Sequence, residues 1–345
     1  MNIKKNLIDK IKKNGSLNVA EFIETCQFEN DGYYLKNNPI GSANDFITSP
    51  EISQMFGEVL ALFLINYWQN KVKTNFNLIE LGPGKGTLLK DILHTSSVSK
   101  KFLNSMNLTL IEKNKSLMDI QKKKFSSNNI TWCKDFNISN KNIPSIIYSN
   151  EFFDCFPVRQ FHKKEKWYEK YVDYNEVEQT FSFVFQQVME EKVLKSLEKF
   201  DQVKVAEIAH SRDEYFKLIC KFIKQNKGLF ITIDYGYKNL PNNLSLQTVY
   251  RHKKTHLFEN IGNQDITAHV NFDKLIFIAN QYNLKIDTFC SQKDFLISNG
   301  IKERMENLKK NKNKETIKNL NSAYQRLVNK SEMGEIFKVL IVSCF

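Results

Sequence analysis

Short runs of apolar residues alternate with amphipathic stretches from Phe76 onward. The short runs predict buried strands, and the stretches between them predict helices that cover a sheet. We expect strands at Phe76–Leu81, Asn107–Glu112, Ile130–Lys134, Ser145–Asn150, Gly228–Asp234, Lys285–Cys290 and Phe337–Ser343. Strands that alternate with helices in this way indicate an α/β sheet.

Residues 1 to about 75 form a region of predicted helices that precedes the sheet. The longest apolar stretch of the chain, Phe56 to Trp68, is interrupted by polar residues and is too short to span a bilayer. It therefore predicts a buried helix. Another helix is expected to begin near Pro50, with Ser49 as its N-cap and Pro50 at its first position.

The segment between the fourth and fifth predicted strands is too long for a simple crossover. It predicts an inserted strand pair followed by two helices. The pair is expected at Lys166–Tyr174 and Thr180–Gln187, and the helices around Glu190–Phe200 and Arg212–Lys227. We therefore expect a helical region at 1–75 and a second domain at 76–345, with an insertion at about 155–227.

A glycine-rich turn follows the first predicted strand, in the order Glu80-Leu81-Gly82-Pro83-Gly84-Lys85-Gly86-Thr87. Such a turn lets a polar ligand lie against bare backbone at a helix N-terminus. Its spacing lacks the last small residue of the dinucleotide fingerprint, and its hydroxyl is displaced from the P-loop position. An acid beside the turn suits a cation better than a pyrophosphate. The turn therefore favours S-adenosylmethionine (SAM), which carries an ammonium and a sulfonium, over an ordinary tight connection.

Polar residues end several of the predicted strands, at the edge of the sheet where ligands bind in open α/β folds. Glu112 is placed to accept hydrogen bonds from ribose hydroxyls, and Asp135 and Phe136 are placed to border the adenine. The cofactor-binding residues predicted here are Glu80, Gly82, Pro83, Gly84, Gly86, Glu112, Asp135, Phe136 and Asn150.

Charge and cysteine content narrow the function only slightly. The 345 residues carry a formal net charge of +12, but the lysines are scattered and no aromatic–basic interleaving appears, so a nucleic-acid partner is not favoured. None of the six cysteines forms a C-x-x-C pair, which predicts reduced, buried thiols. His252 and His256 are four apart without the carboxylate of H-E-x-x-H, and no metal site is predicted.

The beginning of the chain, Met1 to Lys13, mixes lysines with isoleucine and leucine and lacks a signal-type apolar run. It predicts an amphipathic first helix of a cytoplasmic protein, without membrane insertion.

A series of motifs spans nearly the whole chain. They are Asp45-Phe46-Ile47-Thr48-Ser49-Pro50-Glu51-Ile52-Ser53-Gln54-Met55-Phe56-Gly57-Glu58, Glu80 to Gly86, Asn150-Glu151-Phe152-Phe153-Asp154, Pro157-Val158-Arg159-Gln160-Phe161, Ile233-Asp234-Tyr235-Gly236, Asp265-Ile266-Thr267-Ala268-His269-Val270, and Met333 to Leu340. In this order the motifs resemble those of the MidA-like SAM-dependent methyltransferases, a family that includes a mitochondrial arginine methyltransferase needed for assembly of respiratory complex I. Asn44 stands where the family pattern has glycine, and both residues tolerate a left-handed turn.

The resemblance implies a class I methyltransferase fold: a Rossmann-like, mostly parallel seven-stranded sheet whose last strand is antiparallel, with family-specific additions. It implies SAM as cofactor and a protein arginine as acceptor, on a complex I (NADH dehydrogenase) subunit. It also implies the cytoplasm of a bacterium or, in a eukaryote, the mitochondrial matrix.

Methyl transfer to a guanidinium requires that one nitrogen be aimed at the methyl group. Carboxylates do this by bidentate hydrogen bonding, which holds the positive charge on the far nitrogens. Glu151 and Asp154 are the expected catalytic pair, with Asp45 and Glu51 as a second pair over the pocket. Capping of the helix after the fourth strand is the alternative role of Glu151 and Asp154.

Two rival functions remain open. A nucleobase amino-methyltransferase would also have asparagine at the end of the fourth strand, but followed by Pro-Pro-aromatic, whereas Asn150 is followed by Glu-Phe-Phe. The other rival is an assembly factor that binds SAM, or only its partner protein, without catalysis. The complete set of glycines and acids at the turn argues against loss of the cofactor.

Overall fold

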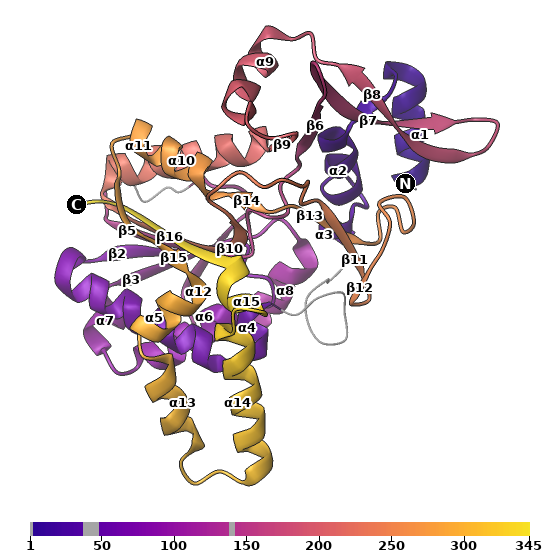
Figure 1. Cartoon of the computed structure of the whole chain (residues 1–345). Coiled ribbons are helices and arrows are strands. Elements are labelled where there is room, and N and C mark those ends of the chain that lie inside the picture. Colours follow the sequence, from indigo (N-terminus) through magenta and orange to yellow (C-terminus); the bar gives the residue numbers. More distant parts are fainter. Residues whose placement is uncertain (1–2, 37–47, 138–141) are drawn as a thin grey trace. The chain divides into compact units, whose positions relative to one another are not determined.

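The computed structural model describes residues 3–36, 48–137 and 142–345, and the chain forms two compact units (Figure 1). The larger unit consists of Ile47–Phe152, Phe216–Gly236 and Lys274–Phe345. The smaller unit consists of Met1–Phe46, Phe153–Tyr215 and Tyr237–Asp273. Each unit therefore collects segments that lie far apart in the sequence, around a sheet and a core of its own.

The larger unit is built on a sheet whose strands follow the order β15-β16-β10-β5-β2-β3-β4. The strands β4, β3, β2, β5 and β10 run parallel, and β16 lies antiparallel between β10 and β15. For these seven strands the predicted fold class is confirmed: the sheet is mostly parallel and its last strand in the chain is antiparallel. The bounds are β2 (Phe76–Leu81), β3 (Met106–Ile111), β4 (Ile130–Cys133), β5 (Ser145–Asn150), β10 (Gly228–Tyr237), β15 (Lys285–Ser291) and β16 (Phe337–Cys344).

The central strands of this sheet are buried on both faces, which explains why they appear in the sequence as continuous apolar runs. Every residue of β2 is buried. On one face, Phe56 and Leu60 of α5 (Gln54–Tyr67) belong to the same core cluster as Leu78 and Ile146. Each such side chain stabilises the fold by about 1.5–3 kcal/mol relative to exposure. The long apolar stretch of the sequence is thus a buried helix, as predicted.

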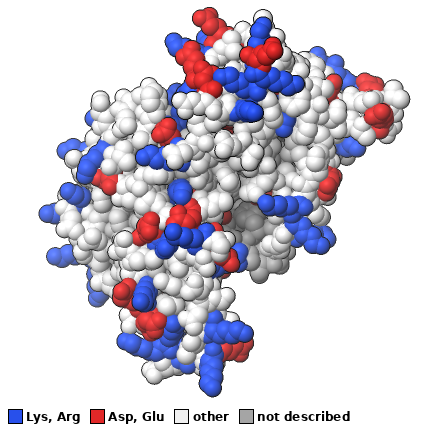
Figure 2. All heavy atoms as spheres, in the orientation of Figure 1, with Lys and Arg blue, Asp and Glu red and all other residues white. Residues whose placement is uncertain are grey.

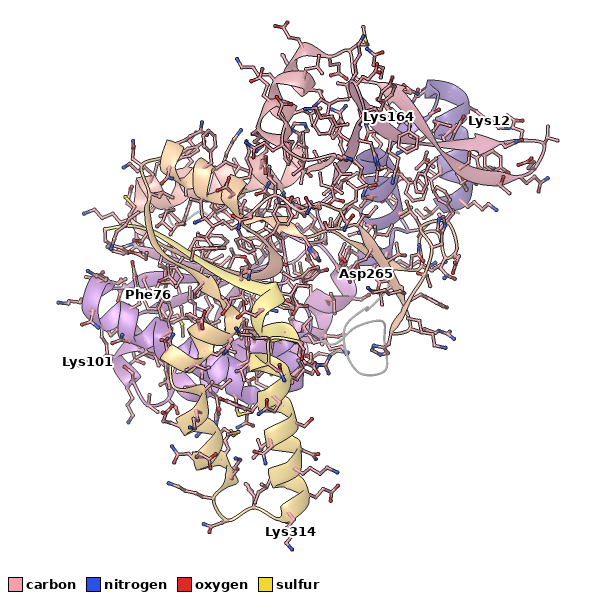
Figure 3. All side chains as sticks on the ribbon, in the orientation of Figure 1. Lys12, Phe76, Lys101, Lys164, Asp265 and Lys314 are labelled. Atoms are coloured by element: carbon pink, nitrogen blue, oxygen red, sulfur yellow. The ribbon has the colours of Figure 1, made fainter. Side chains whose placement is uncertain are left out.

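Aromatic rings close one end of this core. Phe76, labelled in Figure 3, begins β2, and its ring lies 6.2 Å from that of Trp68 and 5.1 Å from that of Phe102. The helices of the larger unit are α4 (Ser49–Ile52), α5, a π-helical turn (Trp68–Val72), α6 (Thr87–Ser96), α7 (Lys100–Asn104), α8 (Lys115–Lys124), α12 (Gln292–Ser298), α13 (Ile301–Lys309), α14 (Lys314–Val328) and α15 (Met333–Ile336). Two further helices, α10 (His210–Asn226) and α11 (Phe272–Gln281), have residues in both units.

The smaller unit has a second sheet in the order β1-β7-β6-β9, with β8 paired to β7. The inserted strand pair is confirmed as β7 and β8, whereas the sequence did not indicate β1, β6 or β9. The strands of this sheet are β1 (Leu17–Asn18), β6 (Arg159–Lys163), β7 (Trp167–Asn175), β8 (Thr180–Gln187) and β9 (Val205–Ile208). A separate three-stranded sheet has the order β12-β11-β13 and consists of β11 (Gln247–Tyr250), β12 (Lys253–Lys254) and β13 (Asp265–Thr267), and the short strand β14 is Val270–Asn271. The helices are α1 (Ile3–Asn14), α2 (Val19–Gln27), α3 (Tyr33–Lys36), α9 (Glu191–Leu197) and a 3₁₀ turn (Glu198–Phe200).

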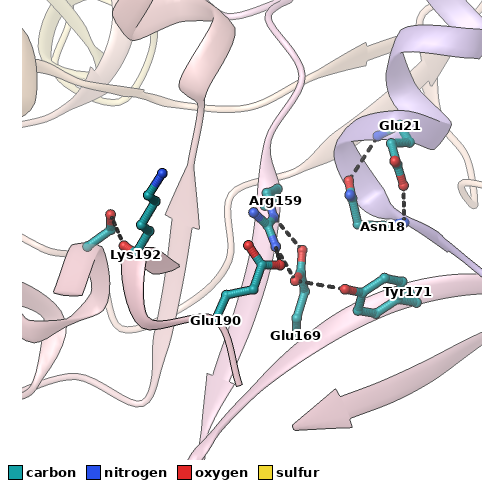
Figure 4. A network of polar contacts seen from close by, with 8 residues as sticks. Asn18, Glu21, Arg159, Glu169, Tyr171, Glu190 and Lys192 are labelled. Carbon is teal, nitrogen blue, oxygen red and sulfur yellow. Dashed lines mark hydrogen bonds and ion pairs between the residues drawn. The ribbon is translucent and has the colours of Figure 1, made fainter. Parts of the chain in front are cut away.

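Polar contacts join the strands of the smaller unit (Figure 4). Arg159 of β6 donates from Nε and Nη2 to the carboxylate of Glu169 on β7, at 2.6 and 2.5 Å. The hydroxyl of Tyr171 donates to the same carboxylate at 3.1 Å. Because the Glu169 side chain is only 3% exposed, this bidentate pair satisfies a charge that burial makes costly to leave alone. Nearby, Asn18 and Glu21 form a capping box that begins α2.

Two local predictions need correction. The helix near Pro50 exists as α4, but its N-cap is Thr48, because Ser49 already lies inside the helix and its N–H donates to Glu151 instead. None of the six cysteines, all of which lie in the described ranges, forms a disulfide, but only Cys26 and Cys220 are buried; the other four are half-buried, since they lie at strand ends and turns near the surface. The predicted site residue Asp45 lies outside the described residues.

The surface carries mixed charge. On the face shown in Figure 2, Lys and Arg side chains are interspersed with Asp and Glu. Within the described residues, no helix combines the length and the apolar character needed to cross a membrane. In the same part of the chain, no group of three or more His, Cys, Asp or Glu side chains is placed to hold a metal ion.

Candidate functional site

The glycine turn lies at the carboxyl end of β2 and leads directly into α6. Gly82, Gly84 and Gly86 have φ angles of +63°, +55° and +70°, in the left-handed region that favours glycine. A Cβ at Gly82 would lie 2.9 Å from the Phe152 ring, and one at Gly86 would lie 2.6 Å from the Phe125 ring. Backbone strain therefore favours glycine at all three positions, and close packing requires it at Gly82 and Gly86. The main chain carries no side chain at these positions; Gly82 is exposed, whereas Gly84 and Gly86 are buried.

The turn is held in place by backbone hydrogen bonds. The N–H of Gly82 donates to the carbonyl of Ile111 at the end of β3, at 3.0 Å. The N–H of Gly86 donates to the carbonyl of Pro83 at 2.7 Å, which closes the turn. Pro83 itself is buried, so its ring packs inward under the turn.

Glu80 is a buried acid near the end of β2, with 4% of its surface exposed. Its register partner on β5 is Tyr148, whose hydroxyl donates to Glu80 Oε2 at 2.9 Å. Burial raises the pKa of Glu80 to about 8; the bond from Tyr148 lowers it, and the nearby charge of Glu112 raises it further. Glu80 is thus a carboxylate whose ionisation is sensitive to any cation placed beside it.

Glu112 is the second buried acid, and it follows β3 directly. The N–H of Asn114 donates to its Oε1 at 2.9 Å, and Nε2 of Gln121 lies 3.4 Å from its Oε2. Burial raises the pKa of Glu112 to about 7, against the lowering effect of hydrogen bonds from these groups and from the N–H groups of Lys113 and Gly84. The sheet therefore brings Glu112 against the glycine turn, as the sequence predicted from their positions at adjacent strand ends.

The end of β5 carries a strained acid. Glu151 has a φ of +50°, a conformation that costs a non-glycine residue about 1–3 kcal/mol and clusters at functional sites. Its Oε1 accepts from Nδ2 of Asn150 at 2.9 Å and from the N–H of Ser49 at 3.0 Å. Because a carboxylate only accepts, the amide nitrogen of Asn150 faces Glu151. Its buried Oδ1 is left without a hydrogen-bond partner among the described residues.

The remaining predicted residues lie in different surroundings. Glu51 accepts a hydrogen bond from Thr87 Oγ1 at 2.5 Å, which places it at the start of α6, beside the glycine turn. Asp135 is exposed and lies 3.6 Å from Lys113 Nζ. The Phe136 ring packs edge-on against Phe222 of α10. Asp154 is buried and belongs to the smaller unit, whereas Glu151 belongs to the larger one.

The structure adds Tyr148 and Gln121, two polar residues that the sequence analysis did not single out, and it shows what Asp234 contacts, a residue that the sequence had placed at a strand end. Tyr148 and Gln121 contact the two buried acids directly. Asp234, three residues before the end of β10, is fully buried and accepts the N–H of Phe152 at 3.1 Å, so it fixes the backbone just after Glu151. Asp234 was visible as an acid at a strand end. Tyr148 lies within an apolar strand and Gln121 within a lysine-rich helix, so neither residue stood out in the sequence. The strand register brings Tyr148 to Glu80, and the orientation of α8 brings Gln121 to Glu112.

Comparison with known proteins identifies the family to which the chain belongs. Residues 59–290 match the model of a family of S-adenosyl-L-methionine-dependent methyltransferases. The chain is 30% identical to the mitochondrial protein arginine methyltransferase NDUFAF7 of Rattus norvegicus, over 96% of this chain and 82% of the relative. It is 30% identical to that of Homo sapiens, over 96% of this chain and 81% of the relative.

A solved structure shares the fold over the whole chain. A Burkholderia thailandensis protein bound to S-adenosyl-homocysteine superposes with a TM-score of 0.86, at 21% identity, covering 99% of this chain and 92% of that one. The chain therefore belongs to the S-adenosyl-L-methionine-dependent methyltransferase family, and it is an enzyme whose cofactor is SAM.

Proposed function

We propose that SAM binds on the bare main chain of residues 82–86, between Glu80 and Glu112. The support is that both acids are buried and neither forms an ion pair within the part of the chain that the structure describes. A buried, unpaired carboxylate is costly unless a ligand compensates it. The cationic methionine end of SAM supplies such compensation beside Glu80, and its ribose hydroxyls are suitable donors to Glu112. These residues therefore fit the cofactor.

Asn150, Asp135 and Phe136 complete the proposed cofactor site, and Glu51 lies beside it. The unpartnered Oδ1 of Asn150 is a ready acceptor for an ammonium or N–H group. Asp135 and Phe136 follow β4, and we assign them to the adenine end. Glu51, through its hydrogen bond to Thr87, supports the start of α6 on the other side of the turn.

The proposed acceptor is a protein arginine, and the proposed orienting acids are Glu151 and Asp154, with Asp45 and Glu51 as the second pair. Bound SAM supplies a methyl group on a sulfonium, which a nucleophile attacks in line. The chain's own task is to orient the acceptor nitrogen and to exclude water. Glu151 suits this task because Asn150 and the N–H of Ser49 fix its carboxylate. A guanidinium held by such a carboxylate keeps its positive charge on the bonded nitrogens.

We infer that the enzyme is a protein arginine N-methyltransferase and that its substrate is a respiratory complex I (NADH dehydrogenase) subunit. The observation that carries the first part is the 30% identity, over 96% of the chain, to relatives named as protein arginine methyltransferases. The second part rests on the MidA-like motifs of the sequence. Such a substrate places the enzyme in a bacterial cytoplasm or in a mitochondrial matrix.

The acceptor is found by incubating the purified protein with methyl-labelled SAM and lysate, followed by mass spectrometry of the labelled material. We expect labelled arginine in a protein, and a complex I subunit among the labelled chains.

We expect Glu151→Gln to lower kcat about 100-fold with unchanged SAM affinity, because an amide cannot hold the guanidinium by two accepted bonds. Exposed Glu332→Gln, in the same unit, serves as the control and should leave kcat unchanged.

The same experiment separates the rivals. Label that disappears on nuclease treatment would indicate a nucleobase acceptor. SAM binding without any labelled product would indicate an assembly factor that does not catalyse the transfer.

Binding of SAM near pH 7 is expected to release protons. In the protein alone, burial places the pKa of Glu112 at about 7 and that of Glu80 at about 8, and a cationic, hydroxyl-donating ligand favours the ionised form of both. Affinity should therefore rise with pH through this range and weaken as the pH falls below it. Calorimetry at pH 7 in two buffers of different ionisation enthalpy counts the protons released. A binding enthalpy that does not depend on the buffer would contradict the assignment.

The raised pKa values of Glu80 and Glu112 also make the free energy of unfolding depend on pH, in the direction opposite to that of SAM affinity. Both acids have a pKa above the ordinary value of 4.5, so the folded protein keeps protons that the unfolded chain has already lost. Their contribution to the free energy of unfolding is therefore greatest below pH 4.5 and decreases as the pH rises toward 8. Saturating SAM should flatten this decrease.

A further inference from the structure

Gln121 is a fully buried polar residue on α8, a helix that otherwise carries many lysines. Its Nε2 donates to the carbonyl of Gly84 at 2.7 Å and lies 3.4 Å from Oε2 of Glu112. Its Oε1 accepts from the indole Nε1 of Trp132, on β4, at 3.1 Å. One side chain thus contacts the glycine turn, the acid that follows β3, and the neighbouring strand β4.

The chemistry of these partners fixes which way the amide points. An indole N–H only donates, so the atom of Gln121 that faces Trp132 is the oxygen. A backbone carbonyl and a carboxylate only accept, so the nitrogen must face Gly84 and Glu112. All three contacts are satisfied by the same orientation and by no other.

Gln121, Gly84 and Glu112 form a closed set of hydrogen bonds beside the turn. The N–H of Gly84 bonds to Glu112, while the carbonyl of Gly84 receives the amide of Gln121. Gln121 therefore sets both the distance between the turn and the acid and the direction in which the acid points. Other contacts of α8 with the turn are more exposed, such as that of Lys124 Nζ with the carbonyl of Lys85.

We propose that Gln121 is a positioning residue for SAM: its amide, oriented by Trp132, holds the Gly84 carbonyl and the Glu112 carboxylate in the arrangement that the adenosine moiety needs. The inference rests on the cofactor site proposed above. Gln121 acts through Glu112 and the turn, and it takes no part in methyl transfer itself.

The test is Gln121→Met, which keeps the length of the side chain and removes its hydrogen bonds. We expect S-adenosylhomocysteine to bind about ten-fold more weakly at pH 8, because Gly84 and Glu112 each lose a buried donor. The pH midpoint of this affinity should move upward, since Glu112 loses a bond that favours its ionised form. The charged groups around Glu112 stay unchanged: Glu80 on β2, and Lys113 with its partner Asp135. The value of kcat at saturating SAM should stay within about two-fold.

A matched control is available in the smaller unit. Gln27 is also fully buried, and its amide bonds to the backbone of Ile266. Gln27→Met should lower the free energy of unfolding to a similar extent, without changing the affinity or its pH midpoint. Equal affinity and equal midpoint in the two variants would overturn the proposal.

A second variant and the affinity of the wild-type protein separate a failure to fold, a failure of the cofactor site and a failure of the role of Gln121. If Gln121→Met fails to fold, Trp132→Phe decides, because it removes only the group that orients the amide. It should weaken binding about three-fold, with an upward midpoint shift, and wild-type behaviour would overturn the inference. If the wild-type protein itself binds no S-adenosylhomocysteine, the proposed cofactor site fails. If the wild type binds normally and Gln121→Met does too, only the role of Gln121 fails.

Discussion

Replacement of Gly84 by Val is expected to abolish methyl transfer while leaving the protein folded. At a φ of +55° a β-branched residue is strained, and its side chain would occupy the main-chain surface on which we place the cofactor. The affinity for SAM should fall by more than about 100-fold, since the ligand and the new side chain compete for the same space. Equilibrium dialysis with labelled SAM measures the affinity, and circular dichroism checks the fold.

The control for this variant is Gly300→Val. Gly300 also has a positive φ, +87°, and a Cβ there would meet only Glu303 Oε2 at 3.7 Å. Both variants should lose about 1–3 kcal/mol of stability from backbone strain, but only Gly84→Val should lose SAM. Activity that survives in Gly84→Val would contradict the placement of the cofactor on the turn.

Loss of Arg304 is expected to cause a large drop in the stability of the larger unit. Arg304 of α13 donates from Nε and Nη2 to the carboxylate of Glu58 on α5, each at 2.6 Å. The Glu58 side chain is 3% exposed, so Arg304→Met leaves a buried charge unpaired. We expect a loss of about 3 kcal/mol in the free energy of unfolding, at the low end of the usual range because Arg304 is 34% exposed. Urea denaturation measures it.

Two companion variants test the cause. The double variant Glu58→Met with Arg304→Met removes both charges and should recover most of the lost stability. Glu306→Gln breaks a more exposed ion pair with Lys309 on the same helix and should cost less than about 1 kcal/mol. If the double variant is as unstable as Arg304→Met alone, packing rather than charge explains the loss.

The elements of the larger unit were largely predictable because their signals are local. The strands β2 and β5 have the predicted bounds, since both are short, largely apolar runs, and β2 stops before Gly82 while β5 ends at the polar Asn150. The predicted end of β10 at Asp234 is too early, because its pairing with β16 continues to Tyr235 and the strand runs on to Tyr237. The strands missed in the smaller unit are short and mix apolar with polar residues, so their alternation was too weak to separate them from loops.

The residues of the proposed site differ in the same way in how far the sequence predicts their arrangement. The proximity of Glu80, Glu112 and the three glycines was predictable from their order along the chain, because parallel strands carry their carboxyl ends to one edge. The strain at Glu151 and the orientation of Gln121 had no local signal. They depend on partners such as Ser49 and Trp132, which approach only when helices and strands pack.

The sequence by itself determined the class of sheet, the glycine turn and the acids that flank it, because periodicity, glycine and strand ends act over a few residues. Only the tertiary structure decided that Leu17–Asn18 pairs with Val172 and Tyr171, and that the amide of Gln121 spans the turn and Glu112. Such pairings join positions far apart in the chain, and they depend on which surfaces remain to be buried after the local elements have formed. The same dependence on burial sets the ionisation of Glu80 and Glu112, which no local pattern of residues specifies.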